Sequence, residues 1–130
     1  MIGLDTNILV RYFTQDDRVQ SQHANRIMAG FSEHAPGFIS VVTLAETMWV
    51  LQKHYGLLTP QLAEIVRTLL QTSTLVVQHE QQVYTAMASM DVNSASFSDA
   101  LIGAIGAWAG CSTTLTFDRK AARLPTFTHA

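Results

Sequence analysis

The 130-residue chain contains a single cysteine, Cys111, so no disulfide can form within it. No apolar run approaches the roughly 18 residues that a membrane-spanning helix needs. The chain also lacks a basic segment followed by an apolar one at its start, which is the pattern of a signal peptide. A cysteine-poor chain suits a reducing compartment. We therefore expect a cytoplasmic protein with no membrane partner.

Charge is also scarce, because charged residues make up 14% of the chain and the formal net charge is −2. This balance argues against a protein that holds nucleic acid through bulk positive charge alone. The length and the 48% hydrophobic content fit one domain spanning residues 1–130. Four of the ten acidic residues stand in apolar sequence; without them, eight basic residues face six acidic ones. The composition is thus compatible with a metal-dependent nuclease.

The four acidic residues in apolar surroundings are Asp5, Glu46, Asp99 and Asp118. Each lies close to the point where a predicted strand meets a predicted helix. Carboxylates in apolar sequence are costly to bury unless they are paired, hydrogen-bonded or bound to a cation. Four that converge would form an oxygen-rich site suited to Mg²⁺ or Mn²⁺.

Apolar strands and amphipathic helices alternate along the chain. Short strands are expected at residues 1–5, 38–40, 75–77 and 113–117, with a last one near Phe127. Helices are expected at residues 6–14, 17–31, 41–55, 59–72, 80–90 and 99–109. The alternation predicts an α/β fold: a three-layer α/β/α sandwich with a short, mostly parallel central sheet. In such folds, ligands bind at the carboxyl ends of the strands.

Each acidic residue also has a purely structural explanation. Asp is common as a helix cap or turn former, and for Asp99, after Ser98, capping is as good an explanation as ligation. Glu46 interrupts an apolar helix face, which a buried Arg partner would also explain. Asp5 is the clearest ligand candidate, because it directly follows a predicted buried strand. Asp118 ends another predicted strand.

Four segments of the chain, in their order and spacing, resemble the PIN-domain ribonucleases. Within that family they are similar to the VapC-type toxins of bacterial VapBC toxin–antitoxin pairs. The segments are Leu4-Asp5-Thr6-Asn7-Ile8-Leu9, Thr43-Leu44-Ala45-Glu46, Ser98-Asp99-Ala100-Leu101-Ile102 and Thr114-Leu115-Thr116-Phe117-Asp118-Arg119. The resemblance covers essentially the whole chain and implies a PIN-like fold and a metal-dependent endoribonuclease.

The resemblance also implies roles for individual residues. The catalytic and metal-binding residues would be Asp5, Glu46, Asp99 and Asp118, and the residues that support them would be Thr6, Asn7 and Thr116. Direct metal ligation is expected for Asp5 and Asp99, and direct or water-mediated ligation for the other two. One departure is visible at Ser96, where many relatives carry another acidic residue. The implied reaction is phosphodiester hydrolysis assisted by one or two Mg²⁺ or Mn²⁺ ions.

Basic residues close to these segments are candidates for RNA contacts, with a solvated surface as the alternative. They are Arg11, Arg119, Lys120 and Arg123. The five histidines show no metal-ligand spacing.

The implied partners are an RNA substrate, an antitoxin protein and a second copy in a homodimer. The antitoxin would lie along an apolar groove and place a basic side chain among the carboxylates. We expect the large side chains to fill the core, or in part to form an oligomer surface. They are Trp49, Tyr55, Trp108, Met48, Met87 and Met90.

Other functions remain open at this point. The same fold would serve a stand-alone RNA-processing nuclease or a catalytically silent module that binds RNA or protein. A phosphotransferase of the haloacid-dehalogenase type also opens with an apolar strand and Asp, but it needs a second Asp where Asn7 stands. A phosphoacceptor receiver domain needs a central Asp and a late Lys after a strand, which are poorly placed here.

Overall fold

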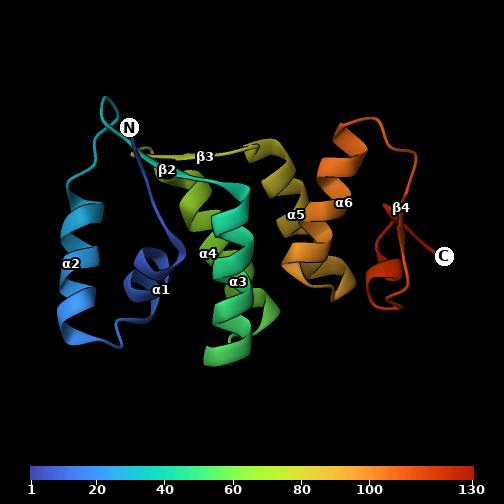
Figure 1. The fold of residues 1–130 in the computed structure, drawn as a ribbon, viewed down its shortest axis with the longest axis horizontal. Coiled ribbons are helices and arrows are strands. Elements are labelled where there is room, and N and C mark those ends of the chain that lie inside the picture. Colours follow the sequence, from blue (N-terminus) through green and yellow to red (C-terminus); the bar gives the residue numbers. More distant parts are fainter.

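The computed structural model describes residues 1–130 and shows helices alternating with short strands (Figure 1). The strands are β1 (Ile2–Gly3), β2 (Gly37–Ile39), β3 (Leu75–Val77), β4 (Thr114–Thr116) and β5 (Phe127–His129). The helices are α1 (Thr6–Thr14), α2 (Arg18–Ala29), α3 (Val41–Tyr55), α4 (Thr59–Gln71), α5 (Glu80–Asn93), α6 (Phe97–Trp108) and the 3₁₀ helix η1 (Ala121–Arg123).

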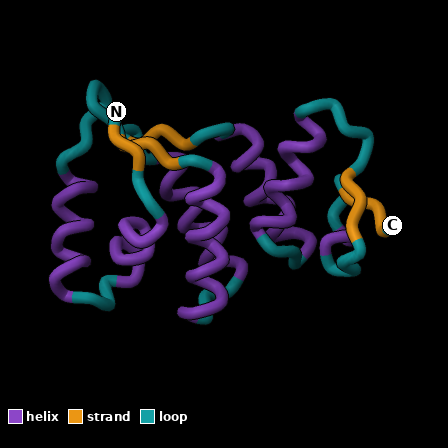
Figure 2. Tube along the Cα trace, viewed as in Figure 1, coloured by secondary structure: helices purple, strands orange, loops and turns teal.

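The strands form two separate parallel sheets. In the first, β1 pairs with β2 and β2 pairs with β3, so the order is β1-β2-β3. In the second, β4 pairs only with β5. Figure 2 shows the two sheets well apart along the long axis of the molecule, with helices between them. The predicted fold class, α/β with a short parallel sheet and flanking helices, is confirmed.

Side chains directly before several helices determine where those helices begin. Asp5 caps α1, Asp17 caps α2, Ser40 caps α3 and Ser96 caps α6, each by accepting a hydrogen bond from a backbone N–H of the first turn. Helix α3 ends where predicted, at Gly56, whose φ of 66° lies in the left-handed region that glycine tolerates.

Some predicted boundaries were wrong. Helix α6 begins at Phe97 rather than Asp99, because the Ser96 Oγ accepts a hydrogen bond from the Asp99 N–H at 3.1 Å. Helix α5 continues to Asn93, beyond the predicted residue 90. Helix α4 ends at Gln71, one residue before the predicted end.

The core is one cluster of buried aliphatic and methionine side chains. The methionines Met48, Met87 and Met90 are buried as predicted. The prediction that both tryptophans fill the core was wrong, since Trp49 is 53% and Trp108 66% exposed. Trp49 lies on α3 beside the buried stripe and not on it, and Trp108 ends α6 beyond its buried residues.

The β4–β5 sheet is fixed against α6. Two glycines of α6 make this close approach possible: a Cβ at Gly103 would collide with the Thr126 side chain and lie 2.7 Å from Phe127, and one at Gly106 would lie 3.0 Å from the Thr114 Oγ1. Leu124, between η1 and β5, is 1% exposed and belongs to the main core. The two strands are thereby held to the helix that precedes them.

None of the helices combines the length and the apolar character that crossing a bilayer requires.

Replacing Gly103 with Ala tests this close approach. Overpacking costs about 1–3 kcal/mol, whereas Ala in a helix gains about 1 kcal/mol over Gly, so we expect a net loss of up to about 2 kcal/mol. Urea denaturation of the variant beside wild type measures the difference. Gly106→Ala is the matched control. Its effect on the free energy of unfolding should be smaller, because the Thr114 hydroxyl that the new Cβ would meet can rotate away. A stabilised Gly103→Ala protein would contradict the packing described.

Candidate functional site

A cavity of about 430 Å³ opens at the carboxyl end of β1, between α1 and α3. Two carboxylates face it, Asp5 from the start of α1 and Glu46 from α3. Its other lining residues are Thr6, Asn7, Val10, Arg11, Val50, His54 and Tyr55. The carboxyl edge of a parallel sheet is where α/β folds bind ligands. We therefore take this cavity as the candidate site.

Asp5 has one oxygen engaged and one available. Its Oδ1 accepts a hydrogen bond from the Thr6 backbone N–H at 2.8 Å, which caps α1 and fixes the direction of the carboxylate. The side chain is exposed, whereas Thr6 beside it is buried. The capping role and a ligand role are therefore compatible, because a carboxylate offers about four lone-pair sites.

Glu46 is carried into the cavity by the second turn of α3. The Ser40 Oγ accepts a hydrogen bond from the Thr43 N–H at 3.1 Å and starts the helix, so Glu46 follows at a fixed angle. The Glu46 side chain is exposed and forms no salt bridge; the ion pairs of the structure are Arg11–Asp16 and Arg67–Glu64. The alternative of a buried Arg partner for Glu46 was wrong.

The four carboxylates are not buried, although their apolar neighbours in sequence had suggested that they would be. Asp5, Glu46 and Asp118 are exposed and Asp99 is half-buried, so none requires a cation to offset burial. Leu4, Leu44 and Leu101 beside them are buried, whereas Leu115 and Phe117 before Asp118 are themselves exposed. What distinguishes Asp5 and Glu46 is that they share a cavity.

Arg11 forms one wall of the cavity and is held by a polar network. Its Nε donates to the Gln20 Oε1 at 2.7 Å, and its Nη1 donates to Asp16 at 3.1 Å and to the Tyr55 hydroxyl at 3.1 Å. The Tyr55 hydroxyl in turn donates to Asp16 at 2.6 Å. These contacts raise the pKa of Arg11, chiefly through the Tyr55 hydrogen bond. Arg11 therefore presents a fixed positive charge beside the two carboxylates.

The structure does not bring the other two predicted residues into this cavity. Asp99 lies in the first turn of α6, and Asp118 lies two residues after β4. The Asp118 Oδ1 accepts hydrogen bonds from the Lys120 N–H at 2.8 Å and the Ala121 N–H at 3.4 Å, while its own N–H donates to the Thr116 Oγ1 at 3.0 Å. Asp118 and Thr116 thus contact each other beside β4, which Figure 1 shows beyond α6 and far from α1.

Nowhere in the chain do three or more His, Cys, Asp or Glu side chains gather closely enough to hold one metal ion. The candidate cavity supplies two carboxylates, which is short of the four-carboxylate set expected from the sequence. As arranged within one chain, these residues do not complete a metal site. The four-carboxylate site remains a prediction, and its missing members are Asp99 and Asp118.

Four residues of the cavity, Val10, Val50, His54 and Tyr55, were missed as site residues, although spacing in sequence could have revealed two of them. Val50 and His54 follow Glu46 at intervals of four residues, which places all three on one face of α3. Tyr55 and its hydrogen bond to Asp16 join segments 39 residues apart, and no local pattern predicts that contact.

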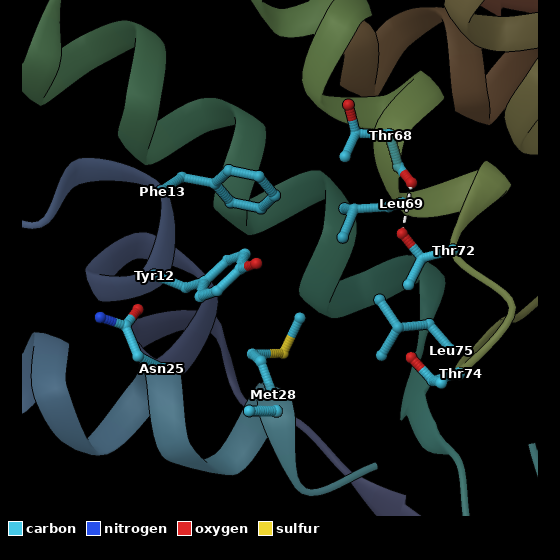
Figure 3. A pocket seen from close by; sticks show the side chains of 10 residues that line it. Tyr12, Phe13, Asn25, Met28, Thr68, Leu69, Thr72, Thr74 and Leu75 are labelled. Atoms are coloured by element: carbon cyan, nitrogen blue, oxygen red, sulfur yellow. Dashed lines mark hydrogen bonds between the residues drawn. The ribbon is translucent and has the colours of Figure 1, made fainter. Parts of the chain in front are cut away.

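A second cavity, of about 360 Å³, lies between α1, α2, α4 and β3 (Figure 3). Tyr12, Phe13, Met28, Leu69 and Leu75 give it mainly apolar walls, and no acidic residue lines it. In Figure 3 the Thr72 hydroxyl donates to the Thr68 backbone oxygen, at 2.7 Å, rather than into the cavity. This cavity therefore lacks the groups that hydrolytic chemistry would need.

Comparison with known proteins identifies one family. The sequence matches the family described as the PIN domain over residues 2–126, which is nearly the whole chain. No curated protein was found to match the chain in sequence.

The Asp16 network predicts a pH-dependent contribution to stability. Hydrogen bonds from Tyr55 and then Thr14 lower the pKa of Asp16 from 3.8 to about 2. A lowered pKa in the folded state stabilises the protein above the unfolded value, and this contribution disappears as pH falls from 3.8 to about 2. We expect Asp16→Asn to destabilise the protein fully above pH 3.8 and progressively less toward pH 2. Urea denaturation of both proteins across this range measures the difference, and a pH-independent difference would contradict the network.

Proposed function

The chain belongs to the PIN-domain family, whose members are generally nucleases that use divalent metal ions, and from this we propose that it is a metal-dependent endoribonuclease. The observation that carries the proposal is the cavity in which Asp5 and Glu46 meet at the carboxyl edge of the sheet. Residues 1–130 would act as one PIN-like unit that cleaves RNA by phosphodiester hydrolysis.

The chemistry of the cavity supports a hard cation. Exposed carboxylate oxygens without competing ion pairs are the ligands that Mg²⁺ and Mn²⁺ prefer. Such an ion, when bound, would activate water and stabilise charge on the phosphate. In our proposal Asp5 is a direct ligand, Glu46 acts directly or through water, and Asp99 and Asp118 complete the set. Thr6, Asn7 and Thr116 support these carboxylates, of which Thr6 already orients Asp5 through its N–H.

The basic residues divide into two groups by their surroundings. Arg11 is already paired with Asp16, so its charge is partly neutralised. Arg119, Lys120 and Arg123 are exposed, lie within five residues of Asp118 and form no salt bridge. We propose that these three contact RNA phosphates and that Arg11 bounds the cavity. Local positive charge would offset the overall net charge of −2.

We further propose that the protein is the toxin of a type II toxin–antitoxin pair, of the VapC kind, and acts in the cytoplasm as a homodimer. The order of the motifs around Asp5, Glu46, Asp99 and Asp118 supports this assignment. The acidic cavity would attract a basic segment of an antitoxin. A stand-alone RNA-processing nuclease would share the same site.

One observation favours a second candidate function, a module that binds RNA without cleaving it. Since no three acidic side chains gather around one point, a single chain in this arrangement lacks a complete metal site. The cleavage experiment below discriminates between the two functions.

Cleavage of a mixed RNA pool tests the nuclease directly. We expect purified protein to cut RNA with Mg²⁺ or Mn²⁺, to stop in EDTA, and to lose activity on Asp5→Asn. Asparagine is as good a helix cap as aspartate, so this variant should keep α1 and the fold. Asp91→Asn, on the exposed face of α5, is the matched control and should cut normally. Undiminished cleavage by Asp5→Asn would refute its role, and no cleavage by folded wild type would favour the binding module.

The salt dependence of RNA binding tests the basic residues. Each lost phosphate contact reduces the slope of log affinity against log salt by about 0.7 for a single strand. We expect Arg119→Gln and Lys120→Gln each to flatten the slope by about this amount and to weaken binding at low salt. Arg26→Gln, on exposed α2, is the control and should leave the slope unchanged. Equal slopes for all proteins would place the RNA elsewhere.

Expression in bacteria tests the toxin assignment. Because free nuclease would degrade cellular RNA, we expect induction of the wild-type chain alone to arrest growth and Asp5→Asn to be harmless at equal protein level. Growth curves with immunoblots measure both. Normal growth with abundant, active wild-type protein would exclude the toxin role and leave the RNA-processing nuclease.

A further inference from the structure

Each of the two sheets ends in two unpaired strand edges, and those of β1 and β4 are the ones whose strands lead into Asp5 and Asp118. β1 pairs with β2 on one side only, and β4 pairs with β5 on one side only. Ile2 and Leu4 direct their N–H groups to the Pro36 and Phe38 oxygens, so Gly3 between them faces the free edge of β1. On β4 the Thr114 N–H donates to the Thr126 oxygen, on the side of β5. The backbone groups of Leu115, the next residue, therefore face the free edge of β4.

Neither edge has the features that usually protect the outer strand of a sheet. Parallel sheets are normally buried, and an isolated pair of strands is marginally stable in water. Yet apolar side chains stand in solvent along both edges: Ile2 is 64% exposed on β1, and Leu115 and Phe117 are 68% and 85% exposed on and after β4. Charged or proline residues, which usually protect an exposed edge, are absent from both strands.

Within one chain these edges lie far apart. Figure 1 shows the N-terminal segment that forms β1 on one side of α3, α5 and α6, and β4 on the other side. The β4–β5 pair is also fixed to α6 by the close approach at Gly103 and by the buried Leu124. Bringing β4 to the β1 of its own chain would therefore require α6 to leave its place against α3 and α5.

We propose that the free edge of β4 pairs in parallel with β1 of a second copy of this chain. By two-fold symmetry the β1 of the first copy receives β4 of the second, so the β1 and β4 edges of both copies are paired in a closed dimer. The exposed apolar side chains Ile2, Leu115 and Phe117 are then covered at two equivalent junctions.

The pairing would complete the candidate site, and this part of the inference rests on the proposed nuclease function. Asp5 lies two residues after the end of β1, and Asp118 lies two residues after the end of β4. Neighbouring strands run about 4.8 Å apart, so parallel pairing places the two carboxylates at one edge of a continuous sheet. Asp118 of the second copy thereby supplies a third carboxylate to the cavity of Asp5 and Glu46.

Charge also favours this arrangement. The turn after β4 carries Arg119, Lys120 and Arg123, which have no carboxylate partner, and the cavity after β1 presents Asp5 and Glu46. Docking β4 on β1 brings the basic turn of one copy to the acidic cavity of the other. RNA phosphates bound by that turn would then lie beside the carboxylates.

Disulfide trapping tests the pairing without reference to catalysis. In a Cys111→Ser background, Leu115→Cys is combined with either Ile2→Cys or Gly3→Cys, because side chains of successive residues point to opposite faces of the sheet. We expect one combination to form a disulfide between chains and to run as a dimer on a non-reducing gel. Val19→Cys with Leu115→Cys, both exposed but far apart in the proposed dimer, is the control and should stay monomeric. A disulfide within one chain, or none in either combination, would overturn the proposal.

Mixing two inactive variants tests the shared site. Asp5→Asn and Asp118→Asn proteins are each expected to be inactive, whereas their equimolar mixture after subunit exchange has one intact site in each mixed dimer. Half of the dimers are mixed, so about a quarter of the wild-type activity should return. No recovery, with active wild type and trapped dimers, would show that the site is not shared. An inactive wild type with trapped dimers would refute the nuclease function and leave the strand pairing intact.

Discussion

The parallel pairing of β1 with β2 is the constraint on which the candidate site depends. The Leu4 N–H donates to the Phe38 oxygen at 2.9 Å, so the two strands end at the same level. Each strand end then starts a helix through its own cap, Asp5 for α1 and Ser40 for α3. Because the two helices leave from neighbouring positions, Asp5 and Glu46 reach one cavity although 41 positions separate them in sequence.

Local signals predicted most of the elements. Helices α1 and α3 and strand β3 were predicted with their observed boundaries, because caps such as Gly56 and short apolar runs carry the needed information in a few residues. The start of α6 was misplaced because Ser96, read only as the absence of an acidic residue, is the helix cap. Both Ser96 and Ser98 could cap a helix, and the sequence alone does not show which hydroxyl meets the free N–H groups of its first turn.

The site was less predictable than the fold, because it depends on contacts between distant segments. Glu46 was recognised as unusual, but whether it points into the core or out of it depends on which face of α3 is buried. The Tyr55–Asp16–Arg11 network joins three elements and has no sequence motif. Above all, nothing in residues 113–117 indicates which strand edge β4 will meet, since hydrogen-bonding edges are alike.

An incomplete site in each chain would have a consequence for the toxin role that we propose. If the third carboxylate comes from a second copy, cleavage requires assembly, and a partner that covers the free edge of β1 would prevent it. The same apolar strand edges and the acidic cavity would then govern dimer formation, RNA positioning and inhibition together. The division of the strands into two sheets and the proposed function would then have one common explanation.

The most direct test of this account is the rate of RNA cleavage per chain measured over a wide range of protein concentration, with a saturating divalent ion. If the acidic cavity is a nuclease centre completed by a second copy, the rate per chain should rise with concentration and level off once dimers predominate. A cleavage rate per chain that stays constant down to concentrations at which the protein sediments as a monomer would contradict it.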